Sequence, residues 1–237
     1  VSFEADSSLN SIGTNAFNGA TALTSIDIPE KVTSIGPSAF ESATGLTQVT
    51  FAPDISFGGI PGRMFYGATG LTSIDIPNTV TTIGAKAFYG ASNLYTITFE
   101  ENSTLDTIGS EAFRNTIIAS IEIPASVTTI GTSVFYWNWR LYTLTFEAGS
   151  NLETIGASAF RETSLDTITI PASVTTIGPN AFEGSDRFGR VQYITFADGS
   201  LNSIGTGAFQ NTMSTSIAIP AGVTSIGINA FLGAFKL

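Results

Sequence analysis

The chain has 237 residues, a net charge of −10 and a sequence pI near 4.3, so it lacks the basic footprint that nucleic acid binding requires. Hydrophobic residues make up 43% of the sequence and charged residues 12%, which is ample material for a folded core. The absence of cysteine and histidine removes the ordinary catalytic triad and the thiolate nucleophile. No run of about 18 apolar residues is present, so we expect no direct membrane insertion.

A phenylalanine, usually preceded by alanine, returns ten times at intervals of 22 to 27 residues. These residues are Phe17, Phe40, Phe65, Phe88, Phe113, Phe135, Phe160, Phe182, Phe209 and Phe231. A period near 24 indicates a solenoid, in which each unit buries its apolar face only by stacking on its neighbours. We therefore predict a single array of about ten repeats over residues 1–237. Because neither end carries a polar cap, we interpret the chain as a fragment of a longer one.

Within each unit, the first predicted element is a short strand. The alternation over residues 23–28 sends Ile26 and Ile28 inward and Asp27 outward, and Pro29 ends the strand. Glycine after Ile35 is expected to make a tight turn that needs a permissive φ. The Ala-Phe segment that follows is expected to form a single helical or 3₁₀ turn that buries its ring. Parallel strands on one face and short turns on the other are the predicted architecture.

Two unit types alternate along the chain. The shorter type ends its strand in Ile-Pro, as at Pro29, whereas the longer type has phenylalanine there, as at Phe51, followed by two extra residues. The third unit departs most from the pattern, because residues 57–65 lack the Ile-Gly pair.

These units, which read approximately L-x-x-I-x-I-P-x-x-V-x-x-I-G-x-x-A-F, resemble the BspA-like (Treponema-type) class of leucine-rich repeats over the whole chain. The resemblance implies a leucine-rich-repeat solenoid without catalytic residues. It also implies an extracellular or cell-surface location and a role as an adhesin that contacts protein or glycan partners.

Outward strand positions predict a sheet face of hydroxyls and carboxylates. We take its candidate ligand contacts to be Asp27, Asp75, Thr98, Glu122 and Thr145. Such a face suits a protein, a glycan or divalent cations. The alternative is that short β-branched polar residues simply fit exposed strand positions.

The connector after the sixth phenylalanine, residues 136–140, replaces small residues found elsewhere and holds both tryptophans of the chain. Its candidate contacts are Tyr136, Trp137, Asn138, Trp139, Arg140 and the nearby Tyr142. Stacking should bring Tyr89, Arg114 and Arg161 into neighbouring columns. Exposed aromatic rings beside arginine suit sugar stacking or a protein hot spot. The alternative is a local plug, or a contact with a further domain.

An insertion at residues 184–190 gives the longest interval and adds Arg187, Phe188 and Arg190 as candidate contacts. With other arginines these residues would form a basic strip, although solvated counter-charges are the explanation we favour. No metal or cofactor site is expected, because the carboxylates lack the loop spacing of a calcium site. Asn102 begins an Asn-x-Thr sequence whose use as a glycosylation site depends on the source.

The sequence thus predicts a non-enzymatic recognition or adhesion segment of a surface or secreted protein. The alternative is a structural spacer or filament-forming segment that stacks head-to-tail through terminal rungs with unpaired edges.

Overall fold

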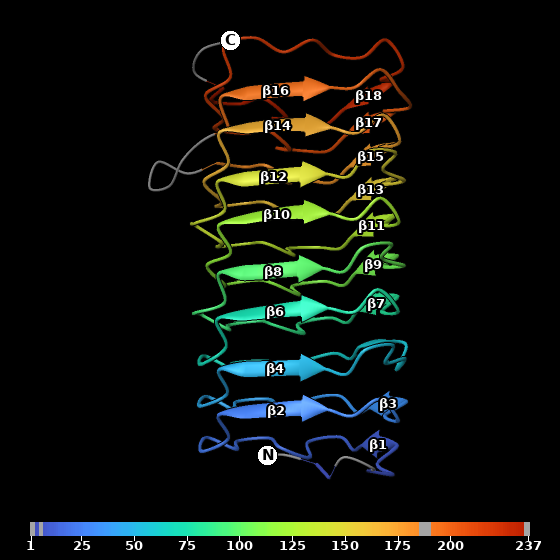
Figure 1. Cartoon of the computed structure of the whole chain (residues 1–237). Helices are drawn as coiled ribbons and strands as arrows, with labels where there is room; N and C mark the ends of the chain where they lie inside the picture. The colour runs from blue at the N-terminus through green and yellow to red at the C-terminus, as the bar shows by residue number, and fades with distance from the viewer. Residues whose placement is uncertain (1–2, 5–6, 185–190, 235–237) are drawn as a thin grey trace.

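The computed structural model describes residues 3–4, 7–184 and 191–234, which wind into a stack of parallel rungs (Figure 1). Every strand pair is parallel and in register between equivalent positions of successive units. The predicted parallel β-solenoid is therefore confirmed. The part of the chain described contains no helix, so the helical form expected for the Ala-Phe turns is wrong.

Four-residue strands form the front of the stack in Figure 1. They are β2 (Ser25–Ile28), β4 (Gln48–Phe51), β6 (Ser73–Ile76), β8 (Thr96–Phe99), β10 (Ser120–Ile123), β12 (Thr143–Phe146), β14 (Thr167–Ile170) and β16 (Tyr193–Phe196). Their alternation is as predicted: Ile26 and Ile28 are buried, while Asp27 between them is exposed. Pro29 follows the end of β2, where the lack of an N–H stops the ladder.

These strands hydrogen-bond in twos and do not form one continuous sheet. The pairs are β2–β4, β6–β8, β10–β12 and β14–β16, each an Ile-Pro strand followed by a Phe strand. Ile28, for example, lies opposite Phe51. Because the half-buried ring of the second strand is bulkier than isoleucine and two extra residues follow it, no ladder continues to the next pair.

A second series of two-residue strands forms a sheet that the sequence analysis did not predict. These are β1 (Ser11–Ile12), β3 (Ser34–Ile35), β5 (Gly59–Ile60), β7 (Thr82–Ile83), β9 (Thr107–Ile108), β11 (Thr129–Ile130), β13 (Thr154–Ile155), β15 (Thr176–Ile177), β17 (Ser203–Ile204) and β18 (Ser225–Ile226). The strands from β5 to β18 make one eight-stranded sheet, and β1 pairs with β3.

The break between β3 and β5 has a covalent cause. Elsewhere the glycine after the Ser/Thr-Ile pair donates its N–H to the isoleucine carbonyl of the preceding rung, as Gly36 does to Ile12 at 2.8 Å. In the irregular third unit that position is Pro61, which has no N–H to donate. Ile60 remains buried, so the unit keeps its core contact while the ladder stops.

Close packing, and not an unusual φ, explains the glycine of the Ile-Gly pair. A Cβ on Gly131 would lie 2.8 Å from the Ser110 nitrogen and 3.0 Å from the Gly109 carbonyl carbon of the preceding rung. Most left-handed φ values fall instead two residues before or two residues after a repeat phenylalanine, as at Ser38 and Ser42 around Phe40. The expectation of a tight turn with a permissive φ at this glycine is therefore wrong.

The phenylalanine column is the centre of the core. Phe17 to Phe231 stack face to face, with ring centroids 5.1 to 5.5 Å apart between successive rungs. The backbone joins the same segments, since Phe88 N–H donates to the Ala112 carbonyl at 2.8 Å. Stacked rungs therefore cohere through both ring contacts and backbone hydrogen bonds.

Gly131→Ala should lower the free energy of unfolding by ~1–3 kcal/mol, because the added methyl overpacks the backbone of the rung below. Gly13→Ala is the matched control: Gly13 also follows an isoleucine, but its Cβ would meet nothing within 4 Å. Urea denaturation followed by circular dichroism measures both variants. Equal stability of the two would contradict the close-approach explanation.

Candidate functional site

The tryptophan connector lies between the Phe135 turn and the start of β12. Trp137 is 52% exposed and Trp139 is 40% exposed, while the equivalent residues of most rungs are small. The Arg140 guanidinium carbon lies 4.7 Å from the centre of the Trp139 ring, which is cation–π geometry. Ser164 donates its hydroxyl to the Trp139 carbonyl at 2.6 Å and ties the connector to the next rung.

Trp137 occupies a left-handed conformation, with φ of 62°. The same left-handed position holds Gly67, Gly90 or Asn115 on some rungs and Ser42 or Glu162 on others. For a bulky side chain the left-handed region is uncommon and costs roughly 1–2 kcal/mol. Because the repeat imposes this φ on most rungs, the bulky exposed ring, and not the φ itself, makes Trp137 a candidate.

Asn138 does not lie on the surface and is not available to a ligand as the sequence analysis expected. It is fully buried, in the column that holds Ala91 two rungs earlier. Its Nδ2 donates to Thr116 Oγ1 at 3.1 Å, whereas its Oδ1 has no hydrogen-bond partner among the described residues. Asn138 therefore anchors the connector between the two exposed tryptophans to the core.

Tyr136 belongs to a ladder of rings and guanidinium groups along the turn side of the stack. Tyr66 and Tyr89 stack with centroids 4.9 Å apart. The Arg114 guanidinium follows, 5.6 Å from the Tyr89 ring and 4.6 Å from the Tyr136 ring. Arg161 lies 5.5 Å from the other side of Tyr136. Stacking thus brings Tyr89, Arg114 and Arg161 close to Tyr136, as the repeat register predicted.

The arginines of this ladder are neutralised by carboxylates. Arg114 lies 3.1 Å from Glu111, and Arg161 Nε lies 3.0 Å from Glu183 but is not aligned for a hydrogen bond. A basic strip through Arg114 and Arg161 is therefore absent, and the counter-charge explanation is the better one for this pair. Arg187, Phe188 and Arg190 lie outside the described residues.

Two exposed tyrosines extend the aromatic surface beyond the connector. Tyr142 is 55% exposed, and Tyr95, which the sequence analysis missed, is 54% exposed. Ala119 separates them: its N–H donates to the Tyr95 carbonyl, and its own carbonyl accepts from Tyr142 N–H. Both tyrosines therefore share a column two rungs apart. Aligning Leu94-Tyr95 with Leu141-Tyr142 in the sequence would have predicted that Tyr95 is exposed like Tyr142.

The predicted sheet-face residues are exposed on successive four-residue strands. Asp27, Asp75 and Glu122 come from Ile-Pro strands, and Thr98 and Thr145 come from Phe strands. Within the first pairs the hydroxyl donates to the carboxylate of the preceding strand, Thr50 to Asp27 and Thr98 to Asp75. These carboxylates are thus partly satisfied by the sheet itself.

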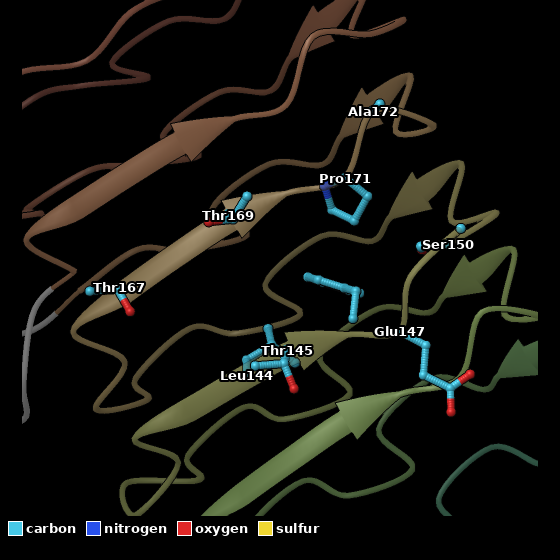
Figure 2. Close-up of a pocket in the computed structure, with 10 residues that line it drawn as sticks. Leu144, Thr145, Glu147, Ser150, Thr167, Thr169, Pro171 and Ala172 are labelled. Atoms are coloured by element: carbon cyan, nitrogen blue, oxygen red, sulfur yellow. The ribbon is translucent and has the colours of Figure 1, made fainter. Parts of the chain in front are cut away.

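Grooves open where the ladder between strand pairs is missing. One has a volume of about 470 Å³ and lies between β12 and β14, lined by Phe146, Pro171, Thr145, Thr167 and Thr169 (Figure 2). A smaller groove of about 190 Å³ lies between β8 and β10 and is lined by Phe99, Glu122 and Glu147. At the β4–β6 junction Phe51 instead stacks on Phe57, 5.4 Å away.

The described residues contain neither a cluster of metal ligands nor a membrane-spanning helix. Within residues 3–4, 7–184 and 191–234, no three or more acidic side chains gather in a way that holds a metal ion. In that same part of the chain no helix is long and apolar enough to cross a bilayer.

Two carboxyl groups near the ends of the ladder have pKa values shifted in opposite directions. The hydrogen bond from Arg63 lowers the pKa of Glu41 below its ordinary value. Burial raises the pKa of Glu183, and the neighbouring Arg161 only partly offsets that effect. Glu41 therefore stabilises the fold above the carboxyl pKa of the unfolded chain, and this stabilisation is lost as pH falls. Glu183 stabilises it at low pH, and its contribution is lost as pH rises.

We expect Glu183→Gln to gain stability relative to the native chain as pH rises from about 4 to 7, because the variant has no carboxyl to ionise in a desolvated position. Glu41→Gln should lose stability relative to the native chain over the same interval. Thermal melting at the two pH values measures both differences. If both variants gained, or both lost, stability relative to the native chain between pH 4 and 7, the opposite pKa shifts of Glu41 and Glu183 would be contradicted.

Comparison with solved structures finds similar folds among bacterial proteins. A leucine rich cell surface protein from Faecalibacterium prausnitzii is 25% identical with a TM-score of 0.52, covering 100% of this chain and 79% of that one. The pneumococcal vaccine antigen PcpA is 20% identical with a TM-score of 0.59, covering 90% of this chain and 60% of that one. A leucine-rich repeat protein from Bacteroides ovatus is 20% identical with a TM-score of 0.50, covering 97% and 81%.

No curated protein matches the sequence. The family described as BspA type leucine rich repeat region matches in six copies, over residues 1–59, 58–189 and 186–237. These matches span the repeats whose Ile-Gly and Ala-Phe positions build the short-strand sheet and the phenylalanine column. The chain belongs to the BspA-type leucine-rich repeat family.

Proposed function

We propose that this chain is a non-enzymatic recognition segment of a secreted or cell-surface protein, an adhesin that binds a protein or glycan partner. The family and the cell-surface relative from Faecalibacterium prausnitzii support this location. The described residues offer columns of packing side chains and shallow grooves, which suit binding better than chemistry.

The tryptophan connector carries the proposal. Trp137 and Trp139 are exposed in a connector where most other rungs have smaller residues, and Trp137 places a bulky side chain at a left-handed position. Arg140 covers one ring, and Tyr142 and Tyr95 extend the same surface along the stack. Large rigid rings beside arginine give much contact area for little loss of side-chain entropy, as in protein hot spots and sugar sites.

The double variant Trp137→Asn, Trp139→Ser should abolish most adhesion without lowering the melting temperature. Asparagine occupies the same left-handed position at Asn115 and Asn211, so relief of strain offsets the lost ring contacts. Binding is measured on a printed glycan array and on immobilised extracellular-matrix proteins.

Tyr193→Ser is the matched control, because it removes a ring that is 57% exposed on β16, away from the connector. Native-level binding by the double variant, or an equal loss in the control, would remove the connector from the proposal.

A further inference from the structure

Arg140 in the tryptophan connector differs from the other described arginines because no carboxylate pairs with it. Each of the others forms an ion pair with a glutamate, and the pairs are Arg63–Glu41, Arg114–Glu111 and Arg161–Glu183. Within residues 3–4, 7–184 and 191–234, Arg140 is thus the one arginine without an ion pair, and it is exposed. On a chain with a net charge of −10, an arginine left unpaired is free to bind an anionic group of a ligand.

The Trp139 ring positions the guanidinium of Arg140. The guanidinium carbon lies 4.7 Å from the ring centre, so the cation covers one face of the indole. The backbone of Trp139 is held in turn by the next rung, where Ser164 donates its hydroxyl to the Trp139 carbonyl at 2.6 Å. A guanidinium is planar, and two of its N–H groups match the two oxygens of a carboxylate. The connector therefore presents a preorganised binding group for a carboxylate.

The exposed rings beside Arg140 suit a sugar. A pyranose has a face of C–H groups, whose partial positive charge packs well on the negative face of an aromatic ring. Trp137 and Trp139 are 52% and 40% exposed, so ring surface is accessible to such a contact from solvent. An anchoring side chain of a protein partner, in contrast, gains most of its binding energy in a well-packed and fully desolvated pocket.

Polar side chains flank Trp137 on both neighbouring rungs. Asn115 precedes it and Glu162 follows it at the same left-handed position of the repeat. The backbone joins these rungs, since Asn115 N–H donates to the Tyr136 carbonyl at 3.0 Å and Trp137 N–H donates to the Arg161 carbonyl at 3.2 Å. The Glu162 carboxylate forms no ion pair with a described residue, so it can accept from sugar hydroxyls. The same carboxylate would repel a chain of closely spaced anionic groups.

We propose that the tryptophan connector binds a sugar that carries a carboxylate, such as a terminal uronic or sialic acid. This inference rests on the proposed function and names the ligand class of the same site. The sugar ring packs on an exposed indole, and its carboxylate accepts two hydrogen bonds from Arg140. Its hydroxyls bond to Glu162 and Asn115 on the flanking rungs.

Two copies of one printed glycan array test the inference. On the first copy the sugars keep their carboxylates, and on the second the carboxylates are converted to neutral amides. The native chain should bind glycans that end in an acidic sugar on the first copy. On the second copy that binding should fall at least about tenfold, because the charged hydrogen bonds to Arg140 are lost while the sugar rings are unchanged.

Variants of Arg140 separate its charge from its shape. Arg140→Gln should lower binding to the acidic glycans about tenfold, and Arg140→Lys should recover only part of that loss, because an ammonium lacks the planar pair of N–H groups. Lys31→Gln is the matched control, since it removes one charge from an exposed lysine between β2 and β3 that has no described ion pair. Its binding should match that of the native chain. Circular dichroism melting verifies that each variant is folded.

Four outcomes would overturn the inference: selective binding of neutral glycans, undiminished binding after amidation, native-level binding by Arg140→Gln, or no bound glycan at all. Failure of the proposed function is a different result, in which the Trp137→Asn, Trp139→Ser variant keeps native binding to every glycan and matrix protein that the chain binds. If that double variant loses binding to a matrix protein and no acidic glycan is bound, the acidic-sugar inference falls while the connector remains the recognition site.

Discussion

Close contact between the backbones of successive rungs is the constraint on which the rest of the structure depends. At the Ile-Gly pair the glycine N–H reaches the isoleucine carbonyl of the preceding rung at 2.7 or 2.8 Å, and a side chain on that glycine would prevent the approach. A spacing of about 4.8 Å then places equivalent residues in contact. Because of that contact, the phenylalanines stack into one column. For the same reason, a single unusual residue packs directly against the equivalent residues of the neighbouring rungs.

Much of the fold follows from local patterns. Alternation placed Ile26 and Ile28 inside, Pro29 ended the strand, and the repeat register brought Arg114 and Arg161 to Tyr136. The short-strand sheet escaped prediction because two residues have no periodicity of their own and become a strand only through neighbouring rungs. The burial of Asn138 also escaped, since a polar residue in a connector is ordinarily exposed and only its column, which holds alanine or threonine on other rungs, indicates otherwise.

The exceptions in the repeat differ in what compensates for them. Pro61 costs one ladder bond, yet Ile60 stays buried and the break is confined to one junction. The connector has no such compensation: Trp137 adopts a left-handed φ, Asn138 leaves a buried oxygen unpaired, and two indole rings stand in solvent. The bulky residue at a left-handed position, the unpaired oxygen and the exposed rings each cost stability and lie next to one another, which is why we propose the ligand contact there.

The turn side and the four-residue-strand side of each rung differ in charge. On the turn side, Arg63, Arg114 and Arg161 are stacked on tyrosines and paired with carboxylates, so that side presents aromatic area with little free charge. On the four-residue strands Asp27 and Asp75 accept from threonine hydroxyls, and none of these described strands carries lysine or arginine, so the face stays negative. A solenoid keeps these sides apart on every rung, because each residue position repeats in its own column. The same fold therefore presents two chemically different surfaces, and substitutions on one should leave binding at the other unchanged.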